Sequence, residues 1–462
     1  MSIMSRLFTG LTVLALAISP TTSQADVPIE VVTSPKGITA WLVEDNSLPL
    51  VSVQFTFDAG SVQEPEGKEG VAILLASMLN EGAGDLDSEA YQQALEQDGI
   101  RFGFDAGSDY FGGHLKAHTE VLDDAIRLAA MGLNDPRFDQ EPLDRMRRGL
   151  IANMRREVSR PSWAAWRAVD VVGYEGHAYS GFAQGTETSL GALTADDLRA
   201  WKRENLTLEG LEIAVVGDIS AEKLAPALDQ IFGGLAERPT NRQSVPFSGV
   251  RNTGKRVLVE KDIPQAEIII LQTGPKRSDP DWWAMRVANH ILGGGGFGSR
   301  LTEELREKRG LTYGVYSWMS PKDHTAQILA STSVAPDKVA EALDLMLAEW
   351  ERMASGEVTE EELTAAKTYL AGALALRMTS TNRVASILRG IKDEGLGVDY
   401  LDKRNAIIDA ITAEDVQRAA RKWLAARDEL LIVVAGQPEG FEPDVTFTLD
   451  QLTPLIADQA SE

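Results

Sequence analysis

The chain has 462 residues, no cysteine and a formal net charge of −24 at pH 7. This length exceeds what one hydrophobic core organises, so we expect at least two domains. The lack of cysteine excludes disulfides, thiolate nucleophiles and cysteine-based zinc sites. The strong negative charge disfavours binding to nucleic-acid backbones and to anionic lipid.

The N-terminal residues have the pattern of a secretory signal. Arg6 precedes the apolar run "LFTGLTVLALAI", and Ser23, Gln24 and Ala25 supply small residues at the spacing of a signal-peptidase site. About twelve apolar residues are too few to span a bilayer. We therefore expect residues 1–25 to be a signal peptide cleaved after Ala25, a periplasmic or secreted protein, and no membrane insertion.

Five stretches recur in the same order about 210–220 residues apart. The pairs are 47–61 with 262–276, 70–82 with 282–294, 90–104 with 301–315, 193–207 with 411–425, and "LEIAVVGDI" with "LLIVVAGQP". Their periodicity predicts strand, helix, helix, strand, several helices and a last strand in each half. A repeat this long indicates duplicated domains rather than a solenoid. We expect an α+β fold of two similar halves, each a largely antiparallel sheet covered by helices.

The repeat also predicts the domain boundaries. The first domain covers residues 26–235 and the second 255–440, and residues 441–462 form an acidic tail. Residues 236–254 are polar and rich in Pro, Asn, Ser and Gly, as is typical of a linker.

Four consecutive glycines, Gly293, Gly294, Gly295 and Gly296, lie within a G-x-G-x-x-G spacing. A dinucleotide site needs a strand before the first glycine and an acidic residue about twenty positions later. Here a helical pattern precedes the glycines, so nucleotide binding is rejected. We expect a flexible turn between two helices, open to another chain, in which Gly293 ends the first helix. Ser299 would cap the second helix and Gly310 would end it.

This glycine-rich stretch, "GGGGFGSRLTEELREKRGLTYGVYS", resembles the pitrilysin/insulinase family of metallopeptidases. The stretches "KEGVAILLASMLNEG", "GHAYSGFAQGTETSLGALTADDLRAW" and "IAVVGDI" carry the same resemblance, which extends over roughly residues 28–440. It implies a clam-like subunit and, in the first half, a helix with the motif H-x-x-E-H. Histidines at i and i+4 hold one Zn²⁺ from one helical face, and the glutamate activates the bound water.

The motif positions are degenerate in this chain. In register with Gly82, the resemblance puts Ile73, Ala76 and Ser77 at the ligand and base positions, and none of them can serve. The third family ligand, a glutamate, falls near residues 150–157, where Glu157 is available. The resemblance therefore implies no metal, no cofactor and no peptide hydrolysis in this chain alone.

The remaining histidines offer little for a metal site. His114 and His118 are four residues apart, but the repeat predicts a strand here, where this spacing spans about 13 Å. Only a local helix would let them share an ion. His177 matches a family position with a structural role, while His290 and His324 look isolated.

Family enzymes also direct an arginine and a tyrosine from the second half toward the zinc site. Arg306 and Tyr313 have the matching spacing of seven, with Tyr313 expected just inside a strand. Both side chains can donate to a peptide carbonyl and to the oxyanion formed on attack. The alternative is a surface arginine and a core tyrosine. Arg300 and Arg309 are expected to be solvated or paired with an acid among residues 303–307.

Some bacterial members of this family divide these parts between two chains. The sequence looks like the chain without zinc, a substrate-binding subunit that supplies Arg306 and Tyr313 to a zinc-bearing homologous partner acting on peptides. One alternative is an inert scaffold or binding protein of the same fold. A second, an independent hydrolase, is disfavoured because no Ser-His-Asp or paired-acid motif is present.

Overall fold

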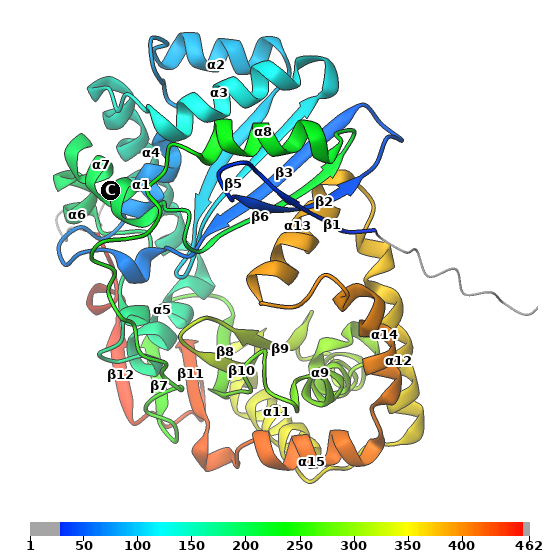
Figure 1. Ribbon diagram of the computed structural model, residues 1–462. Helices are drawn as coiled ribbons and strands as arrows, with labels where there is room; N and C mark the ends of the chain where they lie inside the picture. The colour runs from blue at the N-terminus through cyan, green and yellow to red at the C-terminus, as the bar shows by residue number, and fades with distance from the viewer. Residues whose placement is uncertain (1–27, 456–462) are drawn as a thin grey trace, which may run out of the picture.

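Two six-stranded sheets organise the chain (Figure 1). The computed structural model describes residues 28–455, and the signal peptide expected at residues 1–25 lies outside them. The first sheet has the order β1-β2-β6-β3-β5-β4, with β1 (Glu30–Thr33), β2 (Thr39–Glu44), β3 (Leu50–Phe57), β4 (Arg101–Ala106), β5 (Phe111–His118) and β6 (Leu211–Gly217). The second has the order β12-β7-β11-β8-β10-β9, with β7 (Arg256–Glu260), β8 (Ala266–Thr273), β9 (Val315–Pro321), β10 (Ala326–Val334), β11 (Leu431–Gly436) and β12 (Val445–Thr448).

The two sheets repeat one topology, which confirms the expected α+β fold of two similar halves. Across five strands the order is the same: β2-β6-β3-β5-β4 in the first sheet and β7-β11-β8-β10-β9 in the second. Each set contains one parallel pair, which is β2 with β6 in the first and β7 with β11 in the second. Val53, Phe55 and Phe57 share one core, and Ile268 and Ile270 occupy the equivalent core of the second half.

The sheets differ at one edge strand. β1 comes first in its half and runs antiparallel to β2, whereas β12 comes last and runs parallel to β7. The prediction that residues 441–462 form a tail outside the second domain is therefore wrong for residues 445–448, which belong to the second sheet. Val445–Thr448 pair with Val257–Glu260, because a short alternating segment can complete an open sheet edge.

Each half covers the outer face of its sheet with its own helices. In the first half these are α1 (Val71–Met78), α2 (Ser88–Gln97), α3 (Leu122–Asn134), α4 (Gln140–Ser159), α6 (Glu187–Ala192), α7 (Ala195–Asn205) and α8 (Ala221–Phe232). In the second half they are α9 (Trp282–Asn289), α11 (Val339–Ala354), α12 (Glu360–Ala373), α14 (Tyr400–Ala410) and α15 (Ala413–Trp423). Within residues 28–455, no helix combines the length and the apolarity that crossing a membrane requires.

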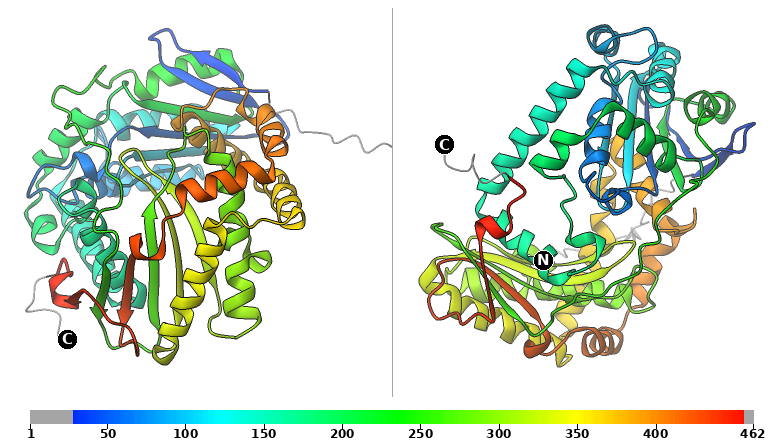
Figure 2. Two further views of the ribbon diagram at one scale, coloured as in Figure 1. Left: turned by 90° about the horizontal axis from the view of Figure 1, so that it is seen from below. Right: turned by 90° about the vertical axis from the view of Figure 1, so that its left-hand side faces the viewer.

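The remaining two long helices are exchanged between the halves (Figures 1 and 2). Helix α5 (Pro161–Gly173) belongs to the first half but packs its alanines and valines on β8 and β11 of the second sheet. Helix α13 (Thr381–Asp393) belongs to the second half but packs on β3 and β6 of the first sheet. Each sheet is therefore sandwiched between its own helices and one helix from the other half.

Strand alternation explains how β3 meets helices on both faces. Successive side chains point to opposite sides of a strand, so the face opposite Phe55 carries Ser52, Gln54 and Thr56. The Ser52 and Thr381 hydroxyls lie 2.9 Å apart, Gln54 Nε2 donates to the Asn382 amide oxygen at 2.9 Å, and Thr56 Oγ1 donates to Asp393 at 2.6 Å. These three contacts fix α13 along the strand.

The exchange makes a prediction about Leu388, which is fully buried between α13 and the first sheet. Leu388→Ala should lower the free energy of unfolding by about 2–5 kcal/mol, because it leaves a cavity at the junction of the halves. The matched control is Leu376→Ala, since Leu376 is 79% exposed. Urea denaturation, monitored by tryptophan fluorescence, measures the free energy of unfolding of both variants. Equal stability of the two variants would contradict the packing of α13 described above.

Candidate functional site

Helix α1, where the resemblance places the zinc motif, has a well-defined start. The Glu64 carboxylate accepts hydrogen bonds from the backbone N–H groups of Gly70 at 2.8 Å and Ala72 at 2.9 Å. Burial raises the pKa of Glu64 to about 8, and these two hydrogen bonds oppose the rise. Gly70 precedes the helix with a φ of 87°, a conformation that favours glycine.

The zinc-motif positions of α1 do not fit a metal. Ala76 is buried and Ile73 half-buried, and neither carries a ligand atom. The half-buried Ser77 donates its hydroxyl to the Leu74 carbonyl at 2.7 Å. Across residues 28–455, no group of three or more histidine, cysteine, aspartate or glutamate side chains is placed to hold a metal ion.

Glu157, the candidate third ligand, lies in the last turn of α4. Its carboxylate forms an ion pair with Arg160 at 3.1 Å. It borders a cavity of about 230 Å³ that Trp163, Trp166 and Asp170 also line. In the resemblance, the other ligands of a zinc ion bound by Glu157 would come from the positions of Ile73, Ala76 and Ser77. None of these side chains can bind zinc, so Glu157 has no partner ligands there.

Asp170, on α5, is the second carboxylate in this cavity. Burial raises its pKa to about 6, while the charges of Arg167 and Lys322 lower it. The Arg167 guanidinium donates to the carbonyls of Ser180 at 2.8 Å and Gly181 at 2.9 Å, so much of its hydrogen-bonding capacity is directed away from Asp170.

His114 and His118 lie on β5, as the repeat predicts, so they are about 13 Å apart along one strand. The His114 ring packs against Gly103 of the neighbouring strand, and burial lowers its pKa. His118 Nδ1 accepts a hydrogen bond from the backbone N–H of Glu120 at 3.4 Å. The two imidazoles do not form a metal site together.

His177 has a structural position. Its Nδ1 accepts from the Tyr179 backbone N–H at 3.2 Å, so its Nε2 carries the proton and donates to the Pro246 carbonyl at 2.9 Å. His324 belongs to no group of potential metal ligands within residues 28–455, although its backbone contacts the first half. Its backbone N–H donates to the Tyr179 hydroxyl at 3.1 Å, because the fold brings the two halves together here.

The glycine run continues a helix rather than ending it. Helix α9 passes into a π-helical turn over His290–Gly294, so Gly293 does not end the helix with positive φ. That conformation belongs to Gly296, with φ of 60°. A Cβ on Gly293 would lie 2.7 Å from the Ser317 nitrogen, so the turn packs too closely on β9 for any side chain there. Gly310, with φ of 63°, follows the next helical segment as expected.

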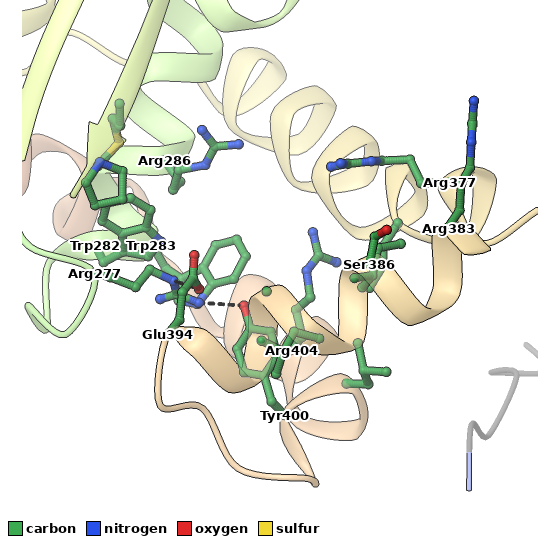
Figure 3. Close-up of a pocket in the computed structure, with 17 residues that line it drawn as sticks. Arg277, Trp282, Trp283, Arg286, Arg377, Arg383, Ser386, Glu394, Tyr400 and Arg404 are labelled. Atoms are coloured by element: carbon green, nitrogen blue, oxygen red, sulfur yellow. Dashed lines mark hydrogen bonds and ion pairs between the residues drawn. The ribbon is translucent and has the colours of Figure 1, made fainter. Parts of the chain in front are cut away.

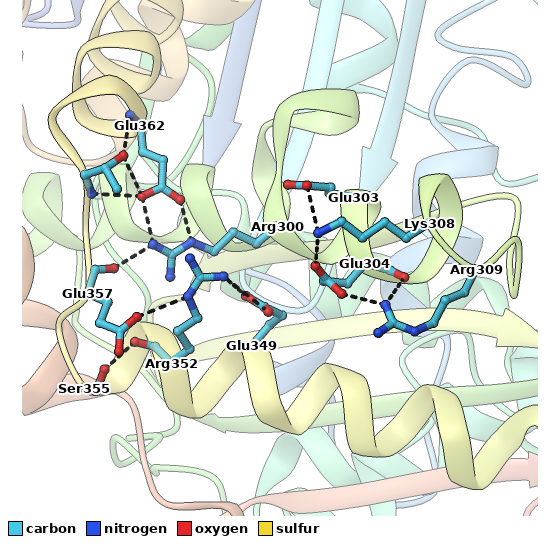
Figure 4. A network of polar contacts seen from close by, with 11 residues as sticks. Arg300, Glu303, Glu304, Lys308, Arg309, Glu349, Arg352, Ser355, Glu357 and Glu362 are labelled. Carbon is cyan, nitrogen blue, oxygen red and sulfur yellow. Dashed lines mark hydrogen bonds and ion pairs between the residues drawn. The ribbon is translucent and has the colours of Figure 1, made fainter.

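That next segment consists of α10 (Arg300–Thr302) and a π-helical turn over Glu303–Glu307. Figure 4 shows its ion pairs. Arg309 pairs with Glu304, as expected. Arg300 was expected near the same acids, but its guanidinium binds both Glu362 oxygens, at 2.6 and 2.8 Å. Glu303 and Glu304 pair with Lys308 and Arg309 instead, whereas α12 brings Glu362 to the buried guanidinium of Arg300.

Ser299 precedes α10 as its N-cap residue, but its hydroxyl makes no capping bond to a helix N–H. The hydroxyl donates instead to the Gly296 carbonyl at 2.8 Å and contacts the Thr302 hydroxyl at 3.1 Å. The expected side-chain cap is therefore wrong, and the hydroxyl joins the glycine turn to the helix instead.

Arg306 lies in the π-helical turn, with 36% of its side chain exposed. Its guanidinium lies over the ring of Phe297, 4.4 Å from the centroid, and 3.8 Å from the Glu307 carboxylate. The Phe297 ring is itself 70% exposed. A cation stacked on an exposed ring keeps its in-plane N–H groups available to a ligand.

Tyr313 is 87% exposed, so the core-tyrosine alternative is wrong. It lies two residues before β9 rather than inside the strand. Its neighbour Thr312 donates its hydroxyl to the Ser333 carbonyl at 2.9 Å, which anchors the loop to β10 and turns the phenol to solvent. Within residues 28–455, no hydrogen bond or cation–ring contact joins the side chains of Arg306 and Tyr313, so each presents its donors separately.

Two features of the second half were missed from the sequence. One is Phe297, which stacks with Arg306. Its position directly after the four glycines could have indicated an exposed aromatic ring. The other is a cavity lined by arginines from five separate segments, including Arg286 and Arg404. No local pattern marks such a set, because only the packing of the helices brings it together.

The raised pKa of Asp170 makes a prediction about stability. A carboxyl whose pKa rises from 3.8 to about 6 on folding favours the folded state while protonated, and this stabilisation is lost as pH rises from about 4 to about 6. Asp170→Asn should therefore gain stability relative to the unmodified protein over that interval. Urea denaturation at a series of pH values measures the difference. Asp428→Asn, at an exposed position, is the control. The prediction is contradicted if the difference in unfolding free energy between Asp170→Asn and the unmodified protein does not change with pH.

Comparison with known proteins places this geometry in one family. The family model described as insulinase (peptidase family M16) matches residues 40–170, and that of the peptidase M16 inactive domain matches residues 192–370. An uncharacterized zinc protease of Streptomyces coelicolor is 30% identical over 257 residues, which are 54% of this chain and 55% of that protein. The match thus spans about half the length of that relative.

Two further similarities cover most of the chain. The non-peptidase homolog YmxG of Helicobacter pylori is 26% identical over 337 residues, which are 72% of this chain and 77% of that protein. The crystal structure of a peptidase M16 inactive domain from Pseudomonas fluorescens has a TM-score of 0.83 and 28% identity, covering 90% of this chain and 99% of that one. The chain therefore belongs to the insulinase (pitrilysin) family, as a non-catalytic member that keeps the fold and lacks the H-x-x-E-H motif.

Proposed function

We propose that this chain is the substrate-binding subunit of a heterodimeric periplasmic zinc peptidase. In this proposal Arg306 and Tyr313 reach the active site of a partner, a homologous subunit that bears the zinc. One observation carries the proposal: the motif positions of α1 hold Ile73, Ala76 and Ser77, whereas the side chain of Arg306 is 36% exposed and Tyr313 is 87% exposed. A periplasmic location rests on the signal-like pattern of residues 1–25.

The chemistry assigned to the two side chains is hydrogen-bond donation. A peptide carbonyl gains negative charge when water attacks it, and donors already in place stabilise that charge without reorganising. Arg306 would supply a charged planar donor and Tyr313 a neutral one. The partner's zinc, once bound there, would supply the activated water. No zinc or other cofactor is assigned to this chain.

A catalytically inert scaffold of the same fold is the second candidate. The stacking of Arg306 on Phe297 and its proximity to Glu307 favour it, because these contacts give the guanidinium neighbours within its own chain. The two candidates differ in what Arg306 and Tyr313 do in a mixture with a zinc-bearing homologue.

Substitution of these two residues tests the proposal. Arg306→Ala or Tyr313→Phe should lower peptide turnover by the reconstituted pair about 10²–10³-fold, as expected for loss of one oxyanion donor. The melting temperature and the dimer dissociation constant should stay unchanged, because each substitution removes few buried atoms. Arg309→Ala and Tyr316→Phe are the matched controls, since Arg309 pairs with Glu304 and Tyr316 is another exposed tyrosine.

Two results would reject the assignment. Unchanged turnover with both variants would favour the scaffold. Lower turnover that recovers fully at high subunit concentration would show that these residues hold the pair together rather than contact substrate.

Zinc content provides a separate prediction. The purified chain should contain no stoichiometric zinc and should cleave no peptide, because α1 offers only Ile73, Ala76 and Ser77 where ligands are needed. Elemental analysis of the chain alone and of the mixed pair measures this. One tightly bound zinc per chain would contradict the proposal and direct attention to His114, His118 and Glu157.

A further inference from the structure

A cavity of about 740 Å³ lies between α9, β9 and helices α13 and α14, and neither Arg306 nor Tyr313 lines it. Five arginines line it: Arg277, Arg286, Arg377, Arg383 and Arg404. Glu394 is the only acidic residue among its lining residues. Such a concentration of positive charge is unexpected in a chain whose formal net charge is −24.

Two of these arginines are held by the protein. Arg277 Nε donates to Glu394 at 2.7 Å, and its Nη2 donates to the Tyr400 hydroxyl at 2.8 Å. Arg404 Nη2 donates to the Leu370 carbonyl at 2.7 Å, and its guanidinium lies 5.2 Å from the ring centroid of Trp283. These contacts fix the position of both groups, and Glu394 is used by Arg277.

The other three arginines lack such partners. In the part of the chain that the structure describes, no hydrogen bond or ion pair is recorded for the guanidinium groups of Arg286, Arg377 and Arg383. Arg286 is the most enclosed of the three. Burial and the charge of Arg277 lower its pKa. Enclosing a cation without a counter-ion costs free energy, and a bound anion would offset that cost.

The guanidinium groups converge. Figure 3 shows those of Arg286, Arg377 and Arg404 directed into one open space from three different segments. Arg286 comes from α9, Arg377 from the 3-10 turn Ala375–Arg377 that follows α12, and Arg404 from α14. A planar guanidinium binds two oxygens of a carboxylate or phosphate at once. Three of them around one space fit more than one anionic group.

We propose that this cavity binds a small polyanion carrying two or more phosphate or carboxylate groups. Its volume lies in the range of small-molecule sites, and Trp282 and Trp283 give it an apolar wall. Ser386 and Ile387 of α13 form another wall, and α13 also packs on the first sheet. A ligand in the cavity would therefore strengthen the junction between the two halves.

Calorimetric titration of the purified full chain tests the proposal. The probes are inorganic tripolyphosphate and citrate, each at low ionic strength. We expect saturable binding at one site per chain for at least one probe, weakening as salt is added, with a change in tryptophan fluorescence from Trp282 and Trp283. Binding of tripolyphosphate alone would identify phosphate as the preferred group, and binding of citrate alone would identify carboxylate.

Two substitutions locate the site. Arg286→Met and Arg377→Gln should each weaken binding by about tenfold or more, because each removes a charged donor to the anion. The matched control is Arg238→Gln, an exposed position in the linker that changes the net charge by the same amount. It should leave the affinity unchanged.

The melting temperature of Arg286→Met distinguishes loss of the anion site from loss of folding. Arg286→Met should raise the melting temperature of the ligand-free protein, since it removes an enclosed charge without a partner, and should abolish the increase that the ligand produces. The proposal is overturned if neither probe binds saturably. It is equally overturned if all three variants weaken binding to the same extent, which would indicate a diffuse effect of charge.

Discussion

The exchange of α5 and α13 is the interaction on which the arrangement of the two halves depends. A sheet that carries apolar side chains on both faces must be covered on both, and the helices of one half reach only the outer face of their own sheet. The inner face is covered by a helix from the other half. The halves therefore complete each other's packing, and their relative placement follows from the same contacts that bury the sheets.

Helix α1 is held in place without any contribution from the positions where the resemblance puts the zinc motif. Helix α1 packs through Leu74, Leu75 and Met78 in the first core, and Glu64 fixes its start through two backbone N–H groups. Neither contribution involves the face that carries Ile73 and Ser77. Packing and capping therefore hold the helix without metal ligands at these positions.

Charge is distributed unevenly over the second half. Around α10, each cation has an acidic partner: Arg300 with Glu362, Lys308 with Glu303 and Arg309 with Glu304. Around the cavity, arginines outnumber acids and three guanidinium groups have no recorded partner among residues 28–455. Paired charges fix a segment in place. Of these three arginines, Arg286 is partly buried whereas Arg377 and Arg383 are exposed, and together they create a positive potential that attracts an anion.

The sequence by itself determined the duplicated α+β architecture and the strand that keeps His114 from His118, while the family resemblance placed Ile73, Ala76 and Ser77 at the motif positions. These depend on periodicity and residue type, which are local properties of the chain. The helix exchange, the edge strand Val445–Thr448, the contact of His324 with Tyr179 and the grouping of Arg286 with Arg377 and Arg404 were decided only by the tertiary structure. Each joins segments far apart along the chain. Local patterns carry no record of such partners, because burial and charge at these positions arise only when the sheets and helices pack.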